Sequence, residues 1–453
     1  MTPVGLGRSS VVILGGGLSG IATAHVLAQA GHQEITVVER ESRLGGLAGS
    51  IEQDGHLYPL GYHHILHRDR TLLYFLEQLG LGGRIAWRRI RMLFESGNRL
   101  YDLANPLDFL RFPMAFADKL RFIRLMLYAF RQSDWDCWQD ASAAEIVDRY
   151  GSSGVRRAIF EPLTRLKFQL PCAEVSGSWL GARLSYREGS APLGYIPGTN
   201  WTTALCEGMS ELLARDRVHV LTGRTVTALH GEAGRVRRAD LDDGTHLAAD
   251  LFVSALPVEV LLRLLPDEAT EELRSIRYTA LLSALCATDQ EIAPSFYWLN
   301  LTSGRHSACA VFNLSGLNPT IGGPGETCLN FVTHLGRDRT MFRESDAEIW
   351  RRYRDDFRAL FGFELTTKWT RLVRVPMYAP VFRVGYRNPP LRSARHGNLF
   401  YTGNYRTHPS VASTGTALAS GIATAGAMLA EAGHHSRVIS AVEGFRFSRR
   451  IAA

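Results

Sequence analysis

The pattern of apolar and polar positions along the first 66 residues predicts a strand, a helix and a second strand, in that order. Val11–Leu14 is an unbroken apolar run beside glycines, which is typical of a buried parallel strand. It leads into Gly15-Gly16-Gly17-Leu18-Ser19-Gly20, and the alanine-rich stretch at 21–30 predicts a helix. The next apolar run, 34–39, ends on Glu39. Two short strands joined by a helix indicate a β-α-β unit of a parallel sheet.

The rest of the chain alternates between helical and strand-like segments. Region 68–187 has the pattern of a largely helical segment. After it, the pattern predicts a helix at 202–214, strands at 217–221, 225–229, 250–257 and 398–404, a turn at 242–244, and a helix rich in small residues from 413. No repeat or low-complexity linker separates these segments, so we predict domains that interleave along the chain.

The composition is that of an ordinary globular protein, since 45% of the 453 residues are hydrophobic and 21% are charged. No window of about 18 apolar residues lacks charges, so no membrane-spanning helix is predicted. The chain starts with a strand instead of a secretory leader, which makes the cytoplasm the expected location. The formal net charge is +7, but no nucleic-acid-binding motif accompanies it, and no nucleic-acid partner is expected. The six cysteines form no C-x-x-C pair, and no metal site is predicted.

The glycines after the first strand suit a dinucleotide-binding turn. Gly15 allows the tight turn, Gly17 lets a pyrophosphate approach the backbone, and Gly20 lets the helix pack closely on the strand. The helix N-terminus offers free N–H groups and the positive end of its dipole to the phosphates. Glu39 lies where a carboxylate accepts hydrogen bonds from an adenosine ribose.

Three further sequence motifs accompany the glycine turn. Arg43-Leu44-Gly45-Gly46 matches an R-x-G-G pattern, 218–226 and 253–257 match strands beside an adenine, and Gly403-Asn404 with 415–421 matches a closing flavin motif. Together with the glycine turn, these segments resemble the two-domain FAD-dependent oxidoreductases that include monoamine and polyamine oxidases, protoporphyrinogen oxidase and phytoene desaturase. UDP-galactopyranose mutase is a structural cousin of that group. The matches reach both ends and the middle of the chain, so the resemblance covers nearly its full length.

The resemblance implies an α/β fold in which a Rossmann-type, glutathione-reductase-like FAD-binding domain is interleaved with an α+β substrate-binding domain. Residues 1–67, 190–265 and 385–435 are expected to form the FAD-binding domain. Residues 68–189 and 266–384 are expected to form the substrate-binding domain, with a mainly helical part at 68–189.

The resemblance also implies a set of residues around the cofactor. Gly45 and Gly46 would contact the flavin phosphate and ribityl chain, while Arg43 would neutralise phosphate charge. Val226 would hold the adenine through its backbone, and the helix start at 415–417 would cover the pyrimidine edge of the flavin ring. The expected cofactor-binding residues are Gly15, Gly17, Leu18, Ser19, Gly20, Glu39, Arg40, Arg43, Gly45, Gly46, Leu47, Gly61, Tyr62, Val226, Ala255, Gly403, Asn404, Ser413, Gly415, Thr416 and Ala417.

Departures from the family pattern limit which reactions and which mode of flavin attachment are expected. The closing motif usually has Gly-Asp, whereas this chain has Gly403-Asn404, whose amide can bond a ribityl hydroxyl or a phosphate but adds no negative charge. Many amine oxidases of the group place a lysine, through a water, at flavin N5, and no lysine lies between Lys167 and Lys368. Amine oxidation of that kind is therefore less favoured than desaturation or dehydrogenation. No cysteine follows Cys328, so the FAD is expected to be non-covalent.

The segment Gly61-Tyr62-His63-His64-Ile65-Leu66-His67 is the most unusual local sequence, and the implied fold brings it over the flavin. His63 and His64 are candidates for catalytic acid–base or hydrogen-bonding roles, and Tyr378 for an aromatic cage near the ring. Packing beneath the flavin explains the histidines equally well, and core packing explains Tyr378. The run from His64 to His67 also resembles the H-I-F-H run of UDP-galactopyranose mutase, but related oxidoreductases carry similar runs.

Basic residues mark the expected substrate region and one helix beside it. Arg165, Lys167 and Arg183 are candidates to bind a carboxylate or a diphosphate of a small-molecule substrate, although solvated or structural cations fit as well. Residues 107–131 combine Leu, Phe, Met and Ile with five basic residues. A basic amphipathic stretch of this kind lies on a membrane surface or covers a domain. Peripheral contact with the inner membrane face through 107–131 therefore stands as an alternative to a free cytoplasmic location.

We interpret the chain as an FAD-dependent oxidoreductase that moves a hydride from a C–H bond of an amine or a largely apolar substrate to flavin N5. The reduced flavin would then pass electrons to oxygen or another acceptor. Two alternatives stay open: a non-redox flavoenzyme of the UDP-galactopyranose mutase type, and a non-catalytic FAD-binding protein. The sequence leaves the substrate, the acceptor and the oligomeric state open.

Overall fold

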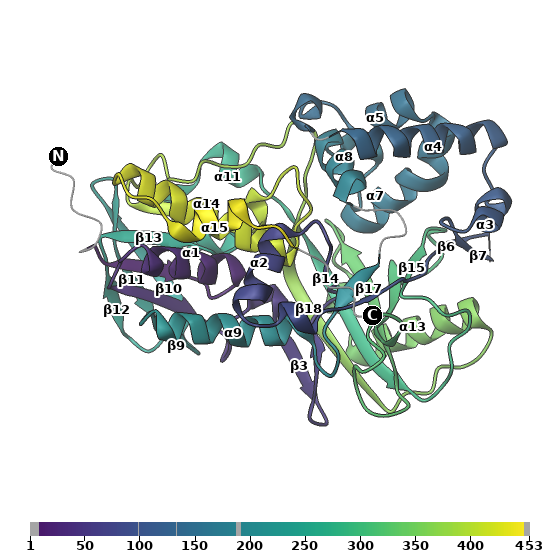
Figure 1. The fold of residues 1–453 in the computed structure, drawn as a ribbon, viewed down its shortest axis with the longest axis horizontal. Helices are drawn as coiled ribbons and strands as arrows, with labels where there is room; N and C mark the ends of the chain where they lie inside the picture. The colour runs from purple at the N-terminus through teal and green to yellow at the C-terminus, as the bar shows by residue number, and fades with distance from the viewer. Residues whose placement is uncertain (1–8, 98, 133, 187–191, 448–453) are drawn as a thin grey trace.

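The computed structural model describes residues 9–97, 99–132, 134–186 and 192–447. They form a mixed α/β structure with one parallel sheet and several sheets that are mainly antiparallel (Figure 1). In Figure 1 the parallel sheet and its helices lie on the left, and a layer of helices lies above a large antiparallel sheet on the right.

The parallel sheet gathers strands from distant parts of the chain. Its order is β19 (Leu399–Tyr401), β13 (Leu251–Ser254), β1 (Val11–Leu14), β2 (Ile35–Glu39) and β9 (His219–Thr222). All four neighbouring pairs are parallel. Because the carboxyl ends of parallel strands meet at one edge, the turn after β1, Glu39 and the residues that follow β13 and β19 come together there.

Apolar layers cover both faces of this sheet. One face packs against α1 (Leu18–Gln29), α2 (Arg70–Gln78), α9 (Trp201–Arg215), α14 (Thr414–Glu431) and α15 (Arg437–Gly444). The other face packs against β10 (Val226–Glu232), β11 (Arg235–Leu241), β12 (His246–Ala248) and α10 (Val258–Leu264). Helix α1 begins at Leu18, three residues before the predicted start, because Gly17 is the extended N-cap residue. Burial on both faces explains why β1 and β13 are apolar without alternation.

The large sheet has seven strands in the order β18 (Trp369–Pro380), β14 (Tyr278–Thr288), β17 (Thr327–Leu335), β16 (Ala310–Asn313), β15 (Trp298–Leu301), β6 (Met92–Ser96) and β7 (Arg99–Asp102). Neighbours are antiparallel except β15 and β6. Helix α13 (Asp346–Phe361) packs on one face through Tyr353 and Phe357. The other face carries Tyr62, Val375 and Tyr378, so it is turned toward the cavity described below.

The helical layer consists of α3 (Pro106–Arg111), α4 (Phe116–Arg131), α5 (Ala143–Tyr150), α6 (Ser153–Val155), α7 (Glu161–Phe168) and α8 (Gly177–Tyr186). Region 68–187 is less uniformly helical than the pattern predicts, since it also holds β5 (Ala86–Arg88), β6 and β7. A turn at Gly97, with φ of 57°, joins β6 to β7, and their apolar positions pair with the large sheet. Residue 187 lies outside the described residues.

Shorter elements complete the chain: β3 (Ser50–Gln53), β4 (His56–Pro59), β8 (Leu193–Tyr195), α11 (Glu271–Ser275) and α12 (Leu314–Leu317). None of the helices in the described ranges is long and apolar enough to cross a bilayer. The first eight residues of segment 1–67 and the boundary between 189 and 190 fall outside the described residues, so the domain limits stay predictions.

Candidate active site

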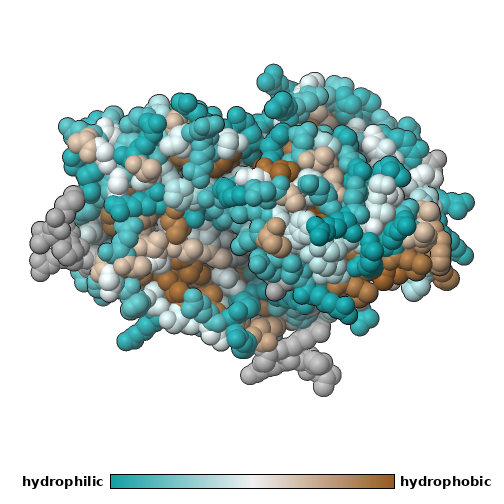
Figure 2. Space-filling view, turned by 90° about the horizontal axis from the view of Figure 1, so that it is seen from above, coloured by the Kyte–Doolittle hydropathy of each residue, from teal (hydrophilic) through white to brown (hydrophobic). Residues whose placement is uncertain are grey.

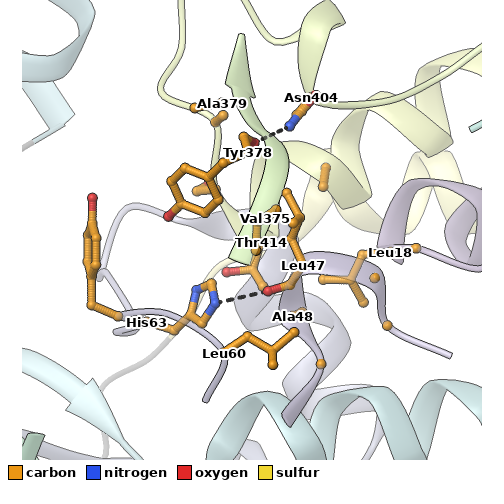
Figure 3. A pocket seen from close by; sticks show the side chains of 18 of the residues that line it. Leu18, Leu47, Ala48, Leu60, His63, Val375, Tyr378, Ala379, Asn404 and Thr414 are labelled. Carbon is orange, nitrogen blue, oxygen red and sulfur yellow. Dashed lines mark hydrogen bonds between the residues drawn. The ribbon is translucent and has the colours of Figure 1, made fainter. Parts of the chain in front are cut away.

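A cavity of about 1920 Å³ runs from the carboxyl edge of the parallel sheet to the helical layer. Gly15, Gly17 and Glu39 line one end. The middle is lined by the segment that contains His63 and by Tyr378 of β18, which face the same space in Figure 3. Apolar side chains form the far end, namely Ile90, Met92, Phe94, Phe122, Met126, Phe130, Ile159, Phe160, Leu163 and Trp298. The cavity therefore joins a nucleotide-sized region to an apolar chamber.

Two glycine loops lie against each other at the sheet end. The Gly45 N–H donates to the Gly16 carbonyl oxygen at 2.8 Å, and a Cβ at Gly46 would come within 3.1 Å of the Gly17 Cα. A Cβ at Gly17, by contrast, would meet no protein atom within 4 Å. The backbone at Gly17 is thus open to the cavity, as a pyrophosphate close to the start of α1 requires.

Glu39 is buried and held by backbone N–H groups. Its Oε2 accepts from the Gly16 N–H at 2.7 Å and its Oε1 accepts from the Glu41 N–H at 2.9 Å. A carboxylate can accept about four hydrogen bonds. The described residues therefore leave about two of its acceptor positions unused, and Glu39 lines the cavity.

Most of the predicted cofactor residues line this cavity. They are Gly15, Gly17, Leu18, Ser19, Glu39, Arg40, Arg43, Gly45, Gly46, Leu47, Tyr62, Val226, Ala255, Gly403, Asn404, Ser413 and Ala417. Gly20, Gly61, Gly415 and Thr416 do not line it. A Cβ at Gly20 would lie 2.2 Å from the Gly15 carbonyl oxygen, so this glycine serves close packing of helix on strand. Thr416 instead shares a capping box with Ser413.

Asp69 is a cavity residue that the sequence interpretation missed. It is 5% exposed, accepts from the Leu72 N–H at 3.2 Å as N-cap of α2, and receives a backbone hydrogen bond from Gly415. A Cβ at Gly415 would come within 1.8 Å of the Asp69 carboxylate. Burial raises the pKa of Asp69 to about 6. Asp69 directly before an apolar helical period is a capping signal, but its contact with α14 is a tertiary feature.

His63 occupies the middle of the cavity with a defined tautomer. Its Nε2 lies 3.3 Å from the Leu47 carbonyl oxygen, a pair that Figure 3 marks with a dashed line. A carbonyl oxygen only accepts, so Nε2 carries the proton and Nδ1 keeps its lone pair. Burial lowers the pKa of His63 to about 4, which keeps the ring neutral at pH 7.

His64 belongs to an aromatic group on the large sheet. Its Nδ1 lies 3.2 Å from the Tyr297 hydroxyl oxygen, and its ring is tilted against Trp298 at 6.3 Å between centroids. Tyr62 stacks on Phe312 at 3.9 Å. His63, His64 and Tyr62 all line the cavity. The contacts of His64 with Tyr297 and Trp298 attach it to the large sheet.

Asn404 fastens the closing motif to the large sheet. Its side-chain Nδ2 donates to the Tyr378 carbonyl oxygen at 3.0 Å (Figure 3). An aspartate has no proton at that position when ionised, so the amide makes a bond that Gly-Asp cannot. Burial raises the pKa of Tyr378 well above its ordinary value, so its hydroxyl stays protonated near neutral pH.

Lys167 and Arg183 line the far part of the cavity, whereas Arg165 does not. Arg165 turns outward, with 60% of its side chain exposed, and pairs with Glu161 at 3.0 Å. Burial and the neighbouring Arg183 charge lower the pKa of Lys167 to about 7. Burial and the nearby charges of Lys167 and Arg183 also lower the pKa of His334, to about 3. Within the described ranges, neither Lys167 nor Arg183 has a carboxylate within ion-pair distance.

These features fit a dinucleotide with a flavin ring. The open Gly17 backbone suits a pyrophosphate, Glu39 keeps acceptor positions for a ribose, and the small residues near Ser413 and Ala417 leave room at the start of α14. Of the three lysines, Lys167 alone lines the cavity. No group of three or more potential metal ligands occurs in the part of the chain that is described.

Comparisons with known proteins agree with this geometry. A sequence profile of the flavin containing amine oxidoreductases matches residues 18–429. The chain is 25% identical over 293 residues to a 15-cis-phytoene desaturase of an Oncidium hybrid cultivar, covering 58% of this chain and 48% of that protein. It is 30% identical over 164 residues to coproporphyrinogen III oxidase of Mycobacterium bovis, covering 34% and 36%. The chain thus spans about half the length, or less, of these curated relatives.

A solved structure shares the fold along nearly the whole chain. It comes from Exiguobacterium sp. 255-15, and its designation as a protoporphyrinogen oxidase is itself an inference. The two superpose with a TM-score of 0.76 at 19% identity, covering 94% of this chain and 99% of that one. At this identity the likeness establishes the fold alone.

Proposed function

The chain belongs to the flavin containing amine oxidoreductase family, and we propose that it binds FAD non-covalently and oxidises a C–H bond of a largely apolar, anionic substrate. The family implies a flavin. The single observation that carries the rest is the continuous cavity from Gly17 and Glu39 to the apolar chamber, with Lys167 and Arg183 in its wall.

In this proposal the dinucleotide half of FAD lies at the sheet edge. Gly17 and the start of α1 bind the pyrophosphate, Glu39 accepts from the ribose, and Val226 contacts the adenine through its backbone. Residues 1–67, 190–265 and 385–435 then form the Rossmann-type FAD-binding domain, and 68–189 and 266–384 the interleaved substrate-binding domain. Cys286, Cys309 and Cys328 are buried and absent from the cavity lining, so they offer no thiol for a thioether link. Cys206 lines the cavity beside Gly45, but burial raises the pKa of its thiol to about 12, so it stays protonated and poorly nucleophilic.

Bound FAD supplies an acceptor for a hydride at N5, and the protein positions the substrate carbon against it. The substrate would lose a hydride to the bound flavin and a proton to water, which would leave a new double bond, and oxygen or another acceptor would then take the two electrons. His63 would offer its Nδ1 lone pair as a hydrogen-bond acceptor in the cavity, since Nε2–H is held by Leu47 and the low pKa keeps the ring neutral. Tyr378 keeps its hydroxyl proton and acts as a donor. His64 holds the aromatic wall in place.

The cavity favours dehydrogenation or desaturation over amine oxidation. Protonated amines are cations, and Lys167 and Arg183 would repel them. An apolar molecule with a carboxylate or phosphate would instead place its charge at these cations and its chain among Phe122, Met126 and Phe160. Burial of that charge against two cations fits the finding that neither Lys167 nor Arg183 has an acidic ion-pair partner among the described residues.

Anaerobic mixing of the flavin-loaded protein with apolar acids, such as polyene carboxylates, tests this function. The proposal expects bleaching of the oxidised flavin band near 450 nm, roughly stoichiometric with substrate, and recovery on adding oxygen or a quinone. Turnover that requires prior chemical reduction and consumes no acceptor would point to a mutase-type isomerase. Retained flavin that no substrate in the panel reduces would support a non-catalytic FAD-binding protein and contradict the proposal.

A further inference from the structure

An apolar surface is exposed on α3 and α4. The described residues include nine exposed large apolar side chains, and seven of them belong to these two helices. They are Leu107, Leu110, Phe116, Leu120, Ile123, Leu127 and Phe130, which are between 41% and 66% exposed. Figure 2 shows a brown patch at the right, on the side where Figure 1 places α3 and α4. We call these seven residues the apolar face. A contiguous patch of this kind on a protein surface marks an interaction site.

The five residues of the apolar face that belong to α4 form a stripe along this helix. At about 100° per residue, the side chains at 116, 120, 123, 127 and 130 fall within roughly 80° of one another around the helix. Leu125 and Ala129 lie on the opposite side, and both are buried among α5 and α8. Helix α4 therefore has two apolar sides, of which the described chain covers one.

One flank of the stripe continues into the cavity. Phe122, Met126 and Phe130 line the apolar chamber beside Ile159 and Phe160. Phe130 belongs to both surfaces, because it is 41% exposed and also lines the chamber. An apolar molecule at the apolar face would thus be next to the chamber.

The other flank is cationic. Arg121, Arg124 and Arg131 lie next to the stripe on α4, and Arg111 ends α3. Arg121 pairs with Asp118 at 3.3 Å, and Arg124 donates to carbonyl groups at the end of α5. Arg111 and Arg131 are exposed and form no ion pair with the residues that the structure describes.

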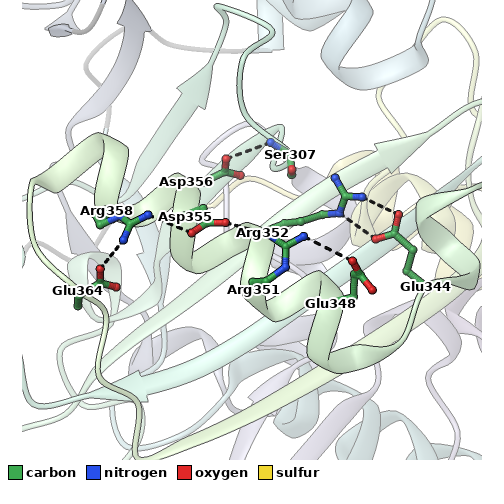
Figure 4. Close-up of polar contacts among 9 residues, drawn as sticks. All are labelled: Ser307, Glu344, Glu348, Arg351, Arg352, Asp355, Asp356, Arg358 and Glu364. Atoms are coloured by element: carbon green, nitrogen blue, oxygen red, sulfur yellow. Dashed lines mark hydrogen bonds and ion pairs between the residues drawn. The ribbon is translucent and has the colours of Figure 1, made fainter.

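Three arginines of α13 have acidic partners instead. Arg351 pairs with Glu348 and Asp355, Arg358 pairs with Asp355 and Glu364, and Arg352 pairs with Glu344 (Figure 4). Acidic neighbours neutralise these three arginines, whereas the exposed Arg354 of the same helix has no ion pair with the residues that the structure describes. Among the described residues Arg111 and Arg131 lack such acidic neighbours, so these two cations beside the apolar face are open to pairing with an external anion.

We propose that the apolar face docks on a lipid bilayer that contains anionic lipids. Its apolar side chains would enter the boundary between headgroups and acyl chains, while Arg111 and Arg131 contact lipid phosphates. The positive border disfavours a second copy of this chain as the occupant, since it would bring like charges together. The chamber would then open beside the acyl region at Phe130, and apolar substrate would reach it from the bilayer. Entry of substrate from the bilayer rests on the proposed function, whereas docking on the bilayer does not.

Co-sedimentation of the flavin-loaded protein with vesicles of phosphatidylcholine, with and without phosphatidylglycerol, tests the docking. The anionic vesicles are expected to bind the wild type more tightly. L120E/L127E should lose binding to both vesicle types, and R111A/R131A should bind anionic vesicles roughly tenfold or more weakly. None of these four residues lines the cavity, so flavin content should be unchanged in both variants.

Two variants on α13 are matched controls. A347E/A359E adds the same two glutamates at exposed helical positions, and R351A/R358A removes the same number of arginines. Both should bind vesicles as the wild type does. Equal losses in the controls and the test variants would overturn the proposal, as would self-association of the wild type that L120E/L127E abolishes without any lipid binding. Protein content of the pellet reports docking separately from flavin, so a failed flavin assignment would remain distinguishable.

Discussion

Lys167 and Arg183 set the electrostatics of the apolar chamber. Burial disfavours both positive charges, and the Arg183 charge further disfavours the charged form of Lys167, which is why the pKa of Lys167 falls to about 7. An anionic group bound between them would favour the protonated lysine and raise its pKa again. The two side chains thus link substrate charge to pH.

This linkage predicts a pH-dependent affinity. We expect dodecanoate to bind about tenfold more weakly at pH 8 than at pH 6, because only about a tenth of Lys167 stays protonated one unit above its pKa. Dodecanol, which has no charge, should bind equally at both pH values. The change in flavin absorbance on titration measures both affinities.

Lys167→Met should bind dodecanoate weakly and without this pH dependence. Lys368→Met is the matched control, since Lys368 lies outside the cavity and pairs with Glu326. A wild-type pH profile in Lys167→Met would show that another group titrates.

Asp69 predicts a second pH effect, on stability. Its pKa is about 6 in the folded chain and about 4 when unfolded, so the folded state binds more protons between these values. This contribution to stability is full below about pH 4 and is lost as the pH rises through 6. Asp69→Asn keeps the cap on α2 but cannot ionise. The variant should be more stable than wild type by up to about 3 kcal/mol at pH 8, and the gain should vanish near pH 4.

Thermal unfolding of both proteins at the two pH values measures this difference. A variant that is no more stable than wild type at pH 8 would argue that the Asp69 carboxylate is well solvated or compensated there.

At the scale of elements, the close contact of α1 and α14 depends on Gly421. A Cβ at this position would come within 2.2 Å of the Ser19 carbonyl oxygen and 2.9 Å of the Ala22 Cβ. The Thr23 hydroxyl donates to the Gly421 carbonyl oxygen at 3.1 Å. The two helices carry the glycine turn and the closing motif, so their separation governs the width of the cofactor region.

Gly421→Ala should therefore separate the helices and lower the free energy of unfolding by about 1–3 kcal/mol. It should also weaken flavin retention. Gly444→Ala is the control, since a Cβ there would meet no atom within 4 Å. Unfolding monitored by circular dichroism should give a lower Tm for the first variant and an unchanged or higher Tm for the second.

Elements with a strong local pattern were predictable from the sequence. Strand β1 and the predicted helix 202–214, which is α9 (Trp201–Arg215), lie within a few residues of their expected positions. Strands β6 and β7 were missed inside a segment that was expected to be helical. Strand β6 pairs with β15, which lies about 200 residues later, and β7 pairs with β6, so their strand conformation depends on a tertiary contact that local periodicity does not contain.

The same distinction applies to the site. Motifs with fixed spacing place Gly17 and Glu39 at the cavity, because local backbone geometry defines them. Lys167 lines the cavity as its motif suggests, whereas Arg165 and Gly415 do not line it. Arg165 and Lys167 are two positions apart, which is about 200° around a helix at about 100° per residue. Arg165 therefore faces solvent while Lys167 lines the chamber. Asp69 and Gly415 meet only through the packing of α2 near α14.

At the scale of the whole molecule, the cavity connects the parallel sheet, the large sheet and the helical layer. Strands β1, β13 and β19 bring distant segments to one edge, β18 provides Tyr378, and α4 and α7 close the chamber. Each part alone offers only a piece of a binding site. Flavin binding and oxidation in one cavity therefore both require that a dinucleotide flavin occupies its sheet end.

An absorption spectrum of the purified protein, recorded before and after acid precipitation, shows whether the protein binds FAD and whether the flavin is non-covalent. The account predicts flavin bands in the native protein, and a supernatant flavin that chromatography identifies as FAD. Glu39→Ala should reduce the amount retained, because the ribose would lose its acceptor. A colourless protein that also fails to take up added FAD would contradict the account, and flavin that stays in the acid pellet would contradict its non-covalent binding.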